Sequence, residues 1–574
     1  MSTKRCPTCG RTYVDETLNF CLEDGAPLVF GNTDDDPATA IMPSAVLTGE
    51  PPTVTYRSGD HTLSADPNVS APFPQSATPK RNTLIAGIVG VILVAVLGAA
   101  GYYYYARTSG TRIESIAVMP FVNESGNGEV EYLSDGMTET LINSLSQLPK
   151  LSVKGRSSVF RYKGKNVDSK QLASELNVQA VLNGRVLQRG DVLVLSLDLV
   201  DAVTGNQIWG EQYNRRMTDL VSLQNEIARD VSGKLQKKLS GADEQHLAKN
   251  NNVNPEAFQL YLQGRFHWNK RTNEGVDKAI RYFQQAIEKD PGYALAYVGM
   301  ADSFIVVDNL PDNEAKPKAK AMAIKALEID PTLGEAHAVL GSVAIYYEWD
   351  WPRAEREYKR AIELSPNYAT AHHWYGEGLT AVGRFDESLA EYNRAMELDP
   401  LSLAISSDLG WTYFHLRQYD RGIEHLKKLI ELDPTFERTR FYLASLYEEK
   451  QMFEAAIEER QKGLLIGGRN VDRVSAAMKR LSNALATAGP KGYWQTSLEL
   501  TQNAAKRNEE RVNSAEIAMI YAKLGDKDAA FEWLENAFQE RRSDLIFLKV
   551  DPAWDSLRSD PRFSDLVRRT GLPQ

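Results

Sequence analysis

The stretch AEREYKRAIELSP, residues 354–366, decides the fold of much of this chain because related phrases recur along it. Each phrase ends at a proline, and the five prolines are Pro291, Pro331, Pro366, Pro400 and Pro434. They lie 40, 35, 34 and 34 residues apart. A fixed period of this length predicts a solenoid of stacked helical units.

The residues inside each phrase explain how the helices would pack. Small residues recur twelve and five positions before the prolines: Ala279, Ala354, Ser388 and Gly422, then Ala286, Ala326, Ala361 and Ala395. A bulky residue stands between them, as Phe283, Tyr358, Tyr392 or Leu426. Small side chains let helices approach closely, and proline ends the second helix of each unit. The pattern resembles the tetratricopeptide repeat, which implies paired antiparallel helices and a concave groove that binds peptides or proteins.

We expect these repeats over residues 255–467, degenerate and C-terminal helical repeats over 468–545, and a capping tail over 546–574. Aromatic and imidazole side chains gather in the middle repeats: Trp349, Trp351, His372, His373, Trp374 and Trp411. They form either a wall of the groove or packing between helices. His372 and His373 are not expected to chelate a metal together, because adjacent helical residues point about 100° apart.

A second module is expected over residues 112–242. A short strand near 113–121, a helix over 132–148 capped by Ser134 or Asp135, and a helix capped by Asp168 precede three strands and a closing helix. The phrases IAVMPF, YLSDGMTETLINSLSQLPKL, AVLNGRV and DAVTGNQIWGEQYNR resemble the amino-terminal domain of TolB-like proteins. That resemblance implies an α/β module that binds or assembles envelope proteins and does not catalyse a reaction.

The chain opens with CPTCGRTYVDETLNFCLEDG. Cys6-x2-Cys9 and Cys21-x2-Asp24 present two ligand pairs, as in a zinc ribbon over residues 1–30, and we expect a structural zinc ion. Asp24 stands where a fourth cysteine is usual. The alternatives are a degenerate ribbon without metal, or three free thiols.

A proline-rich stretch over 31–82 has no helical or strand period, and its composition predicts a disordered linker. TLIAGIVGVILVAVLGAAGYYYY, residues 83–105, carries no charge and would form about 34 Å of helix, enough to cross a membrane. The flanking charges do not orient this span. The span predicts a single-pass bacterial inner-membrane protein. All three cysteines precede it, which predicts a cytoplasmic N-terminus and a periplasmic or other extracytoplasmic C-terminal bulk.

The charge and the missing motifs argue against two classes of function. The net charge of −10 makes a nucleic-acid partner unlikely. Kinase phrases, GxSxG, HExxH and a P-loop do not occur, so we expect no enzyme. The sequence therefore predicts a multidomain, membrane-anchored protein-binding scaffold, whose solenoid and α/β module bind envelope partners and whose zinc ribbon docks in the cytoplasm. The alternative is a membrane-bound sensory or transcription regulator that signals through the ribbon.

Overall fold

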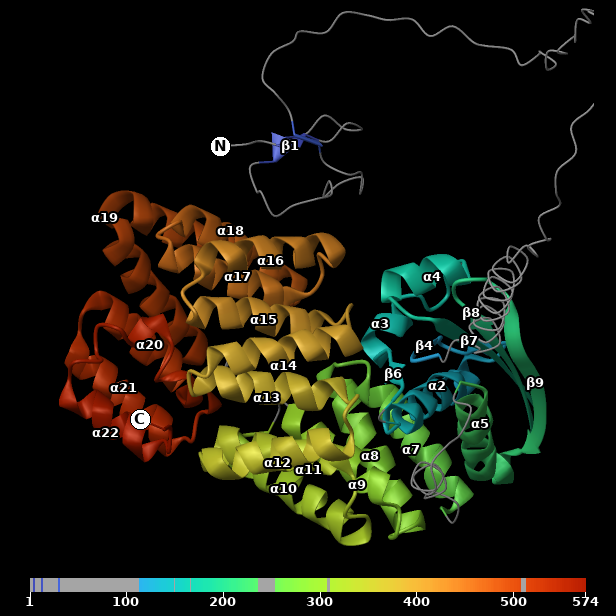
Figure 1. Ribbon diagram of the computed structural model, residues 1–574. Coiled ribbons are helices and arrows are strands. Elements are labelled where there is room, and N and C mark those ends of the chain that lie inside the picture. Colours follow the sequence, from blue (N-terminus) through green and yellow to red (C-terminus); the bar gives the residue numbers. More distant parts are fainter. Residues whose placement is uncertain are drawn as a thin grey trace, which may run out of the picture. The chain divides into compact units, whose positions relative to one another are not determined.

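The computed structural model describes residues 4–5, 12–13, 29–30, 113–148, 150–165, 167–235, 253–306, 310–506 and 513–573 (Figure 1). The chain divides into two compact units, Met1–Ala99 and Ala100–Gln574. In the first unit, strands β1 (Lys4–Arg5), β2 (Thr12–Tyr13) and β3 (Val29–Phe30) form an antiparallel sheet in the order β2-β1-β3.

The second unit begins with an α/β module. Its elements are β4 (Ser115–Val118), β5 (Val122–Asn123), η1 (Gly128–Val130), α2 (Glu131–Ser146), β6 (Ser152–Val153), α3 (Arg156–Phe160), α4 (Ser169–Leu176), β7 (Ala180–Arg189), β8 (Val192–Asp201), β9 (Gln207–Arg216), η2 (Met217–Asp219) and α5 (Leu220–Leu235). The strand order is β6-β4-β7-β8-β9, with β5 also paired to β7. Strand β4 runs parallel to β6 and β7, whereas β7, β8 and β9 form an antiparallel meander.

Alternation along the meander explains how the module folds. On β8, Leu193, Leu195, Leu197 and Leu199 are at most 1% exposed, and they belong to one core with residues of α2 and α5. The predicted cap of α4 is confirmed, because the Asp168 side chain accepts a hydrogen bond from the backbone N–H of Lys170. The predicted caps of the first helix were wrong.

Helix α2 begins at Glu131, so Ser134 and Asp135 lie inside it. Both are buried, and the carboxylate of Asp135 forms an ion pair with Lys163. The sequence offered Ser134 and Asp135 as caps because both are polar, but α2 begins about one turn before them.

The rest of the unit is the predicted helical solenoid. Its helices are α7 (Pro255–Trp268), α8 (Asn273–Lys289), α9 (Ala294–Val306), α10 (Asp312–Ile329), α11 (Gly334–Val343) with the π-helical η3 (Ala344–Glu348), α12 (Trp351–Leu364), α13 (Ala369–Ala381), α14 (Phe385–Leu398), α15 (Leu403–His415), α16 (Tyr419–Leu432), α17 (Glu437–Glu449) and α18 (Phe453–Ile466). Successive helices pair, and the first helix of each pair also packs on the first helix of the next. The chain of first helices α7, α9, α11, α13, α15 and α17 is thus the inner side of the superhelix.

The small and bulky positions behave as expected from the sequence. The small side chains are buried, and Phe283, Tyr358, Tyr392 and Leu426 are 0% exposed. A Cβ atom added at Gly410 would lie 2.3 Å from Leu426 Cδ2, and one at Gly341 would lie 2.8 Å from the Tyr358 ring. Only glycine allows the helices to approach so closely at these two positions.

The C-terminal elements are α19 (Val471–Lys506), which is interrupted at Gly489, then α20 (Ser514–Leu524), α21 (Lys527–Gln539), η4 (Ser543–Phe547), η5 (Pro552–Trp554) and α22 (Pro561–Arg569). They do more than cap the last repeat. The ring of Phe538 lies 4.9 Å from that of Trp349, and Arg541 donates a hydrogen bond to the carbonyl of Tyr347. The C-terminal end therefore folds back onto the middle repeats.

The α/β module docks against the turns between repeats. Lys154 Nζ donates to the carbonyl of Glu397, and the backbone N–H of Gly155 donates to that of Leu398. The buried Asp399 accepts hydrogen bonds from the backbone N–H and the hydroxyl of Ser158. Residues about 240 positions apart thus join the module and the solenoid.

The predicted location needs correction. Among the residues that the structure describes, no helix is long and apolar enough to cross a membrane, and this overturns the assignment of the chain to an inner membrane by a single span. The stretch 83–105 on which that assignment rested lies outside the described residues, as does the predicted linker 31–82.

Asn367 offers a test of the docking. Its side-chain amide donates hydrogen bonds to the carbonyls of Leu148 and Leu151, 3.0 and 2.9 Å away, and is buried with them. Asn367→Ala should cost about 1–3 kcal/mol of unfolding free energy, because buried carbonyls lose their donor. Urea unfolding measures the loss, and Asn273→Ala at an exposed helix start is the control. An unchanged free energy of unfolding for Asn367→Ala would contradict this docking.

Candidate functional site

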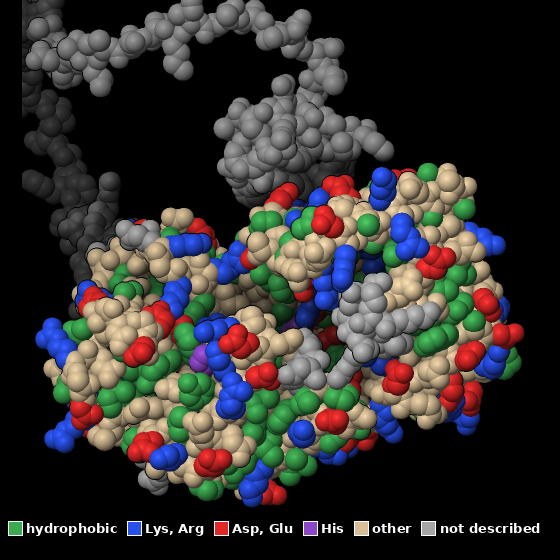
Figure 2. Space-filling view, turned by 180° about the vertical axis from the view of Figure 1, so that it is seen from behind, with side chains coloured by type: hydrophobic (Ala, Val, Ile, Leu, Met, Phe, Trp, Pro, Cys, Tyr) green, Lys and Arg blue, Asp and Glu red, His purple; other side chains and the backbone are tan. Residues whose placement is uncertain are grey.

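Polar side chains of three consecutive first helices meet on the inner side of the solenoid. We call His373, Glu377, Asp408, Arg438 and Tyr442 the groove cluster. The back of the molecule is hollowed near its centre, and basic, acidic and histidine side chains line part of that hollow (Figure 2). Charged groups inside a concave surface are available to a ligand while they remain partly shielded from water.

The repeat geometry places these residues. His373 and Glu377 are four residues apart on α13, and Arg438 and Tyr442 are four residues apart on α17, so each pair shares a helix face. Asp408 lies on α15, between these two helices in the stack. Because the helices repeat with a period of about 34 residues, corresponding positions on successive first helices lie next to one another on the inner side of the solenoid.

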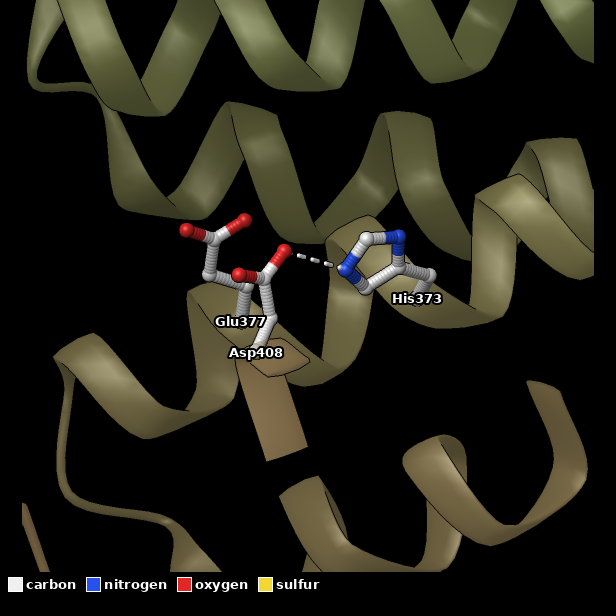
Figure 3. Close-up of side chains that lie close together, drawn as sticks. All are labelled: His373, Glu377 and Asp408. Carbon is white, nitrogen blue, oxygen red and sulfur yellow. Dashed lines mark hydrogen bonds and ion pairs between the residues drawn. The ribbon is translucent and has the colours of Figure 1, made fainter. Parts of the chain in front are cut away.

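Asp408 is the hub of the groove cluster. Its Oδ2 lies 3.0 Å from Nε2 of His373, and its Oδ1 accepts a hydrogen bond of 3.1 Å from the hydroxyl of Tyr442. Arg438 lies 3.5 Å from both oxygens. Asp408 is 6% exposed, whereas half of the Arg438 side chain is accessible to solvent. Figure 3 shows Glu377 beside Asp408 on the side away from His373.

The two carboxylates differ in their electrostatic environment. Burial raises the pKa of Glu377, and the nearby negative charge of Asp408 raises it further. Burial acts in the same direction on Asp408, but the hydrogen bond from His373 and the charge of Arg438 offset it, and the pKa of Asp408 is lowered. The cluster therefore holds a stabilised anion at Asp408 and a second carboxyl group that lacks a comparable cation.

The aromatic residues of the middle repeats differ in how deeply they are buried. Trp349 and Trp351 are buried in the core that joins the middle repeats to the C-terminal end. Trp411 and Trp374 are only partly buried. The Trp411 ring stacks on Tyr442 at 4.6 Å, which places an aromatic surface beside the groove cluster. The packing interpretation is confirmed for Trp349 and Trp351, and Trp374 and Trp411 also pack against hydrophobic cores while they remain partly accessible; the groove-wall interpretation stays a prediction.

The adjacent histidines point to different partners, as expected. His372 lies 2.6 Å from Glu391 through Nδ1 and 3.1 Å from the carbonyl of Pro366 through Nε2. His373 turns instead to Asp408 on the next repeat. The prediction that this pair does not chelate a metal together is confirmed by the directions of the two rings.

A second polar network lies where the module meets the first repeats. Glu139 of α2 forms ion pairs with Arg265 of α7 and Arg156 of α3, and Arg265 also pairs with Asp302 of α9 at 3.2 Å. Burial would raise the pKa of Glu139, but the charges of Arg265 and Arg156 outweigh it and the pKa is lowered. These pairs join the module to the solenoid.

A cavity of about 50 Å³ lies nearby, lined by residues of α2, α5, α7, α9 and α11. The Gln224 amide nitrogen and Glu335 Oε2, both buried, line it without a hydrogen-bond partner among the described residues. A polar space of this size holds a few water molecules.

The predicted zinc ligands Cys6, Cys9, Cys21 and Asp24 all lie outside the described residues, so the zinc ribbon stays a prediction. Sequence reasoning missed Glu377 and Asp408. The spacing His373-x3-Glu377 was a usable signal, because it places both side chains on one helix face. Asp408 carried no local signal, since its approach depends on how α15 stacks on α13.

The comparisons with known proteins support the repeats. Residues 347–402 and 379–437 match one tetratricopeptide repeat model, and residues 515–544 match another. Residues 112–230 match the second domain of HilA/YgeH-like transcriptional regulators. The TolB-like resemblance of this module therefore stays a prediction.

A protein of Rhizobium meliloti described as putative adenylate cyclase 3 is 34% identical over 232 residues, which is 39% of this chain and 39% of that protein. The chain thus spans about two fifths of the length of that curated relative.

Three solved structures are also similar to parts of the chain. A tetratricopeptide protein of Thermus thermophilus is 20% identical, with 33% of this chain and 98% of that one covered and a TM-score of 0.29. PilF of Pseudomonas aeruginosa is 20% identical, with 44% and 92% covered and a TM-score of 0.27. A lipoprotein of Neisseria meningitidis is 22% identical, with 21% and 99% covered and a TM-score of 0.18. None of these likenesses carries an argument about function.

His415 generates a prediction about pH. It stacks at 4.6 Å on Phe547 of the C-terminal end and meets the edge of Trp411, and neither ring nitrogen has a hydrogen-bond partner in the described part of the chain. Burial lowers its pKa to about 3, with a smaller contribution from the charge of Arg417. The unfolded chain therefore takes up this proton first as pH falls below about 6.5.

His415 should accordingly cost the protein about 1.4 kcal/mol of stability per pH unit between about pH 6 and pH 4. His415→Phe keeps the ring stack and should remove this part of the acid sensitivity while leaving stability at pH 7.5 nearly unchanged. Unfolding free energies measured across this range test it. Parallel pH profiles for the parent and the variant would show that His415 is not buried as a neutral ring.

Proposed function

We propose that this protein is a scaffold whose inner solenoid surface, formed by α13, α15 and α17, binds an extended segment of a partner protein. Tetratricopeptide repeats are protein-binding modules, and the repeat matches over 347–437 include α13 and α15 and the turn before α17. The observation that carries the proposal is the groove cluster, which gathers charge and aromatic surface on the concave side.

The chemistry of the cluster suggests how a segment would be held. The guanidinium of Arg438 lies 3.5 Å from the Asp408 carboxylate, and half of the Arg438 side chain is exposed, so it can bind a carboxylate of the partner at little cost. The Trp411 ring stacks on both Phe414 and Tyr442, at 4.2 and 4.6 Å, so an apolar side chain of the partner would contact the edge of this aromatic stack. A segment that carries an acidic residue next to a bulky apolar one fits this arrangement.

A charge reversal in the groove tests the scaffold. The full-length chain, immobilised and exposed to extract from its own organism, should retain a defined set of proteins. Arg438→Glu should reduce the retention of at least one of them about tenfold or more, because a repulsive charge replaces an attractive one. The matched control is Arg360→Glu on α12, where Arg360 pairs with Glu363 on a second helix of the solenoid.

Equal retention by the parent, Arg438→Glu and Arg360→Glu would contradict groove binding. Thermal unfolding of all three proteins shows whether the substitutions leave the fold intact.

A second function, transcription regulation, is favoured by the match of residues 112–230 to the HilA/YgeH-like domain. In this alternative the module and the repeats receive a signal that another part of the chain reports. Adenylate cyclase activity is not proposed, because the chain matches only 39% of the relative that bears that name. A genome-wide map of the DNA bound by the full chain in cells tests this alternative. A regulator should occupy specific DNA sites, whereas a scaffold should not.

The zinc ribbon is proposed as a docking head with Cys6, Cys9, Cys21 and Asp24 as ligands. The full-length chain should retain zinc through gel filtration in these ligands, and Asp24→Ala should lower its zinc affinity about tenfold or more, because only three ligands remain. Elemental analysis and competition with a chromophoric chelator measure both. An Asp24→Ala protein with the affinity of the parent would rule out Asp24 as a ligand.

A further inference from the structure

We propose that His373, Glu377 and Asp408 form a second metal site, which binds a divalent transition-metal ion such as zinc on the inner side of the solenoid. This site is separate from the predicted cysteine ribbon and goes beyond the proposed scaffold function. It would hold the ion with three protein ligands and leave further coordination positions for water or for a donor atom of a bound partner.

The geometry supports three ligands. Each of the three side chains offers one ligand atom, and these atoms all lie within 4.8 Å of one another. Around tetrahedral zinc, with bonds of about 2.0–2.1 Å, ligand atoms lie roughly 3.4 Å apart. The Glu377 carboxylate lies beside that of Asp408 (Figure 3), so we expect the site to close around an ion through a change in the Glu377 side-chain rotamer.

The composition of the set favours a transition metal. Two carboxylates with one imidazole suit zinc, manganese or iron better than magnesium or calcium, which prefer oxygen ligands alone. Arg438 is the cation that contacts Asp408, and it stays half exposed at 3.5 Å. One arginine faces two carboxylates, so a cation between Glu377 and Asp408 relieves their repulsion.

Two tyrosine hydroxyl groups near the proposed ligands also support a metal site. The hydroxyl of Tyr442 holds Asp408 through Oδ1, which leaves Oδ2 directed at His373. Hydrogen bonds of this kind orient metal ligands. A further buried tyrosine, Tyr392, is 0% exposed, and its hydroxyl makes no hydrogen bond of standard geometry within the described residues.

Tyr392 lies close to the proposed ligands. Its ring centroid is 5.8 Å from that of His373. The phenolic hydroxyl of Tyr392 can donate a hydrogen bond to a carboxylate or water of an occupied site.

Two other histidines show what distinguishes this one. His337 pairs with Glu357 at 2.7 Å and His372 pairs with Glu391 at 2.6 Å, each within a single repeat. These are simple pairs of an imidazole with one carboxylate. Of these three histidines, only His373 lies near two carboxylates of this kind. Glu377 is four residues later on the same helix, and Asp408 comes from the next repeat. Binding requires that Nε2 carry its lone pair, so the neutral imidazole proton moves to Nδ1.

The test uses the full-length chain with Cys6, Cys9 and Cys21 changed to serine, so that the predicted ribbon cannot bind zinc. After removal of metal with a chelator, titration calorimetry with zinc chloride should give one site per chain. Glu377→Gln in the same background should weaken zinc binding about tenfold or more. His372→Gln is the matched control and should bind zinc as the thiol-free parent does.

Two results would overturn the site: no saturable zinc binding by the thiol-free parent, or equal affinity for the parent and Glu377→Gln. His373→Gln and circular dichroism melts of every variant show whether a lost signal reflects a lost ligand or a lost fold. Retention of partner proteins by the Glu377→Gln chain is measured separately, so failure of the metal site does not decide the scaffold.

Discussion

Close packing of helices at a 34-residue period is the constraint on which the rest of this structure depends. Each repeat places a large side chain against small ones, as where Leu426 fills the space that Gly410 leaves open. The same spacing orders the first helices side by side along the inner surface. Because that stacking brings α13, α15 and α17 into line, it also creates the groove cluster.

Two sets of contacts then join the solenoid to distant parts of the chain. The α/β module joins the repeats through Glu139, Asn367 and Asp399, and the C-terminal end returns to the middle repeats at Trp349 and His415. Neither contact follows from the repeat pattern, since each involves partners that are more than one hundred residues apart in the sequence. They tie the repeats to structure on both sides of the solenoid in the sequence.

The sequence predicted the parts of the fold that depend on local period. The burial of Tyr358 and Tyr392, the strands of the meander and the cap at Asp168 all follow from spacing and residue type. The start of α2 was misread because Ser134 and Asp135 are polar, although both are buried inside the helix. The groove cluster was not predicted, because Asp408 meets His373 only through the stacking of two repeats. The inner-membrane assignment rested on the hydropathy of residues 83–105 and on the placement of the cysteines, and it is corrected by the absence of a spanning helix among the described residues.

The central claim is that the inner surface of α13, α15 and α17 binds a partner segment. Amide hydrogen exchange of the full chain, measured alone and with a captured partner, tests it most directly. We expect the partner to slow exchange in the first helices α13, α15 and α17, with little change in the paired second helices α14 and α16. Protection confined to the sheet of the α/β module, with α13, α15 and α17 unchanged, would contradict it.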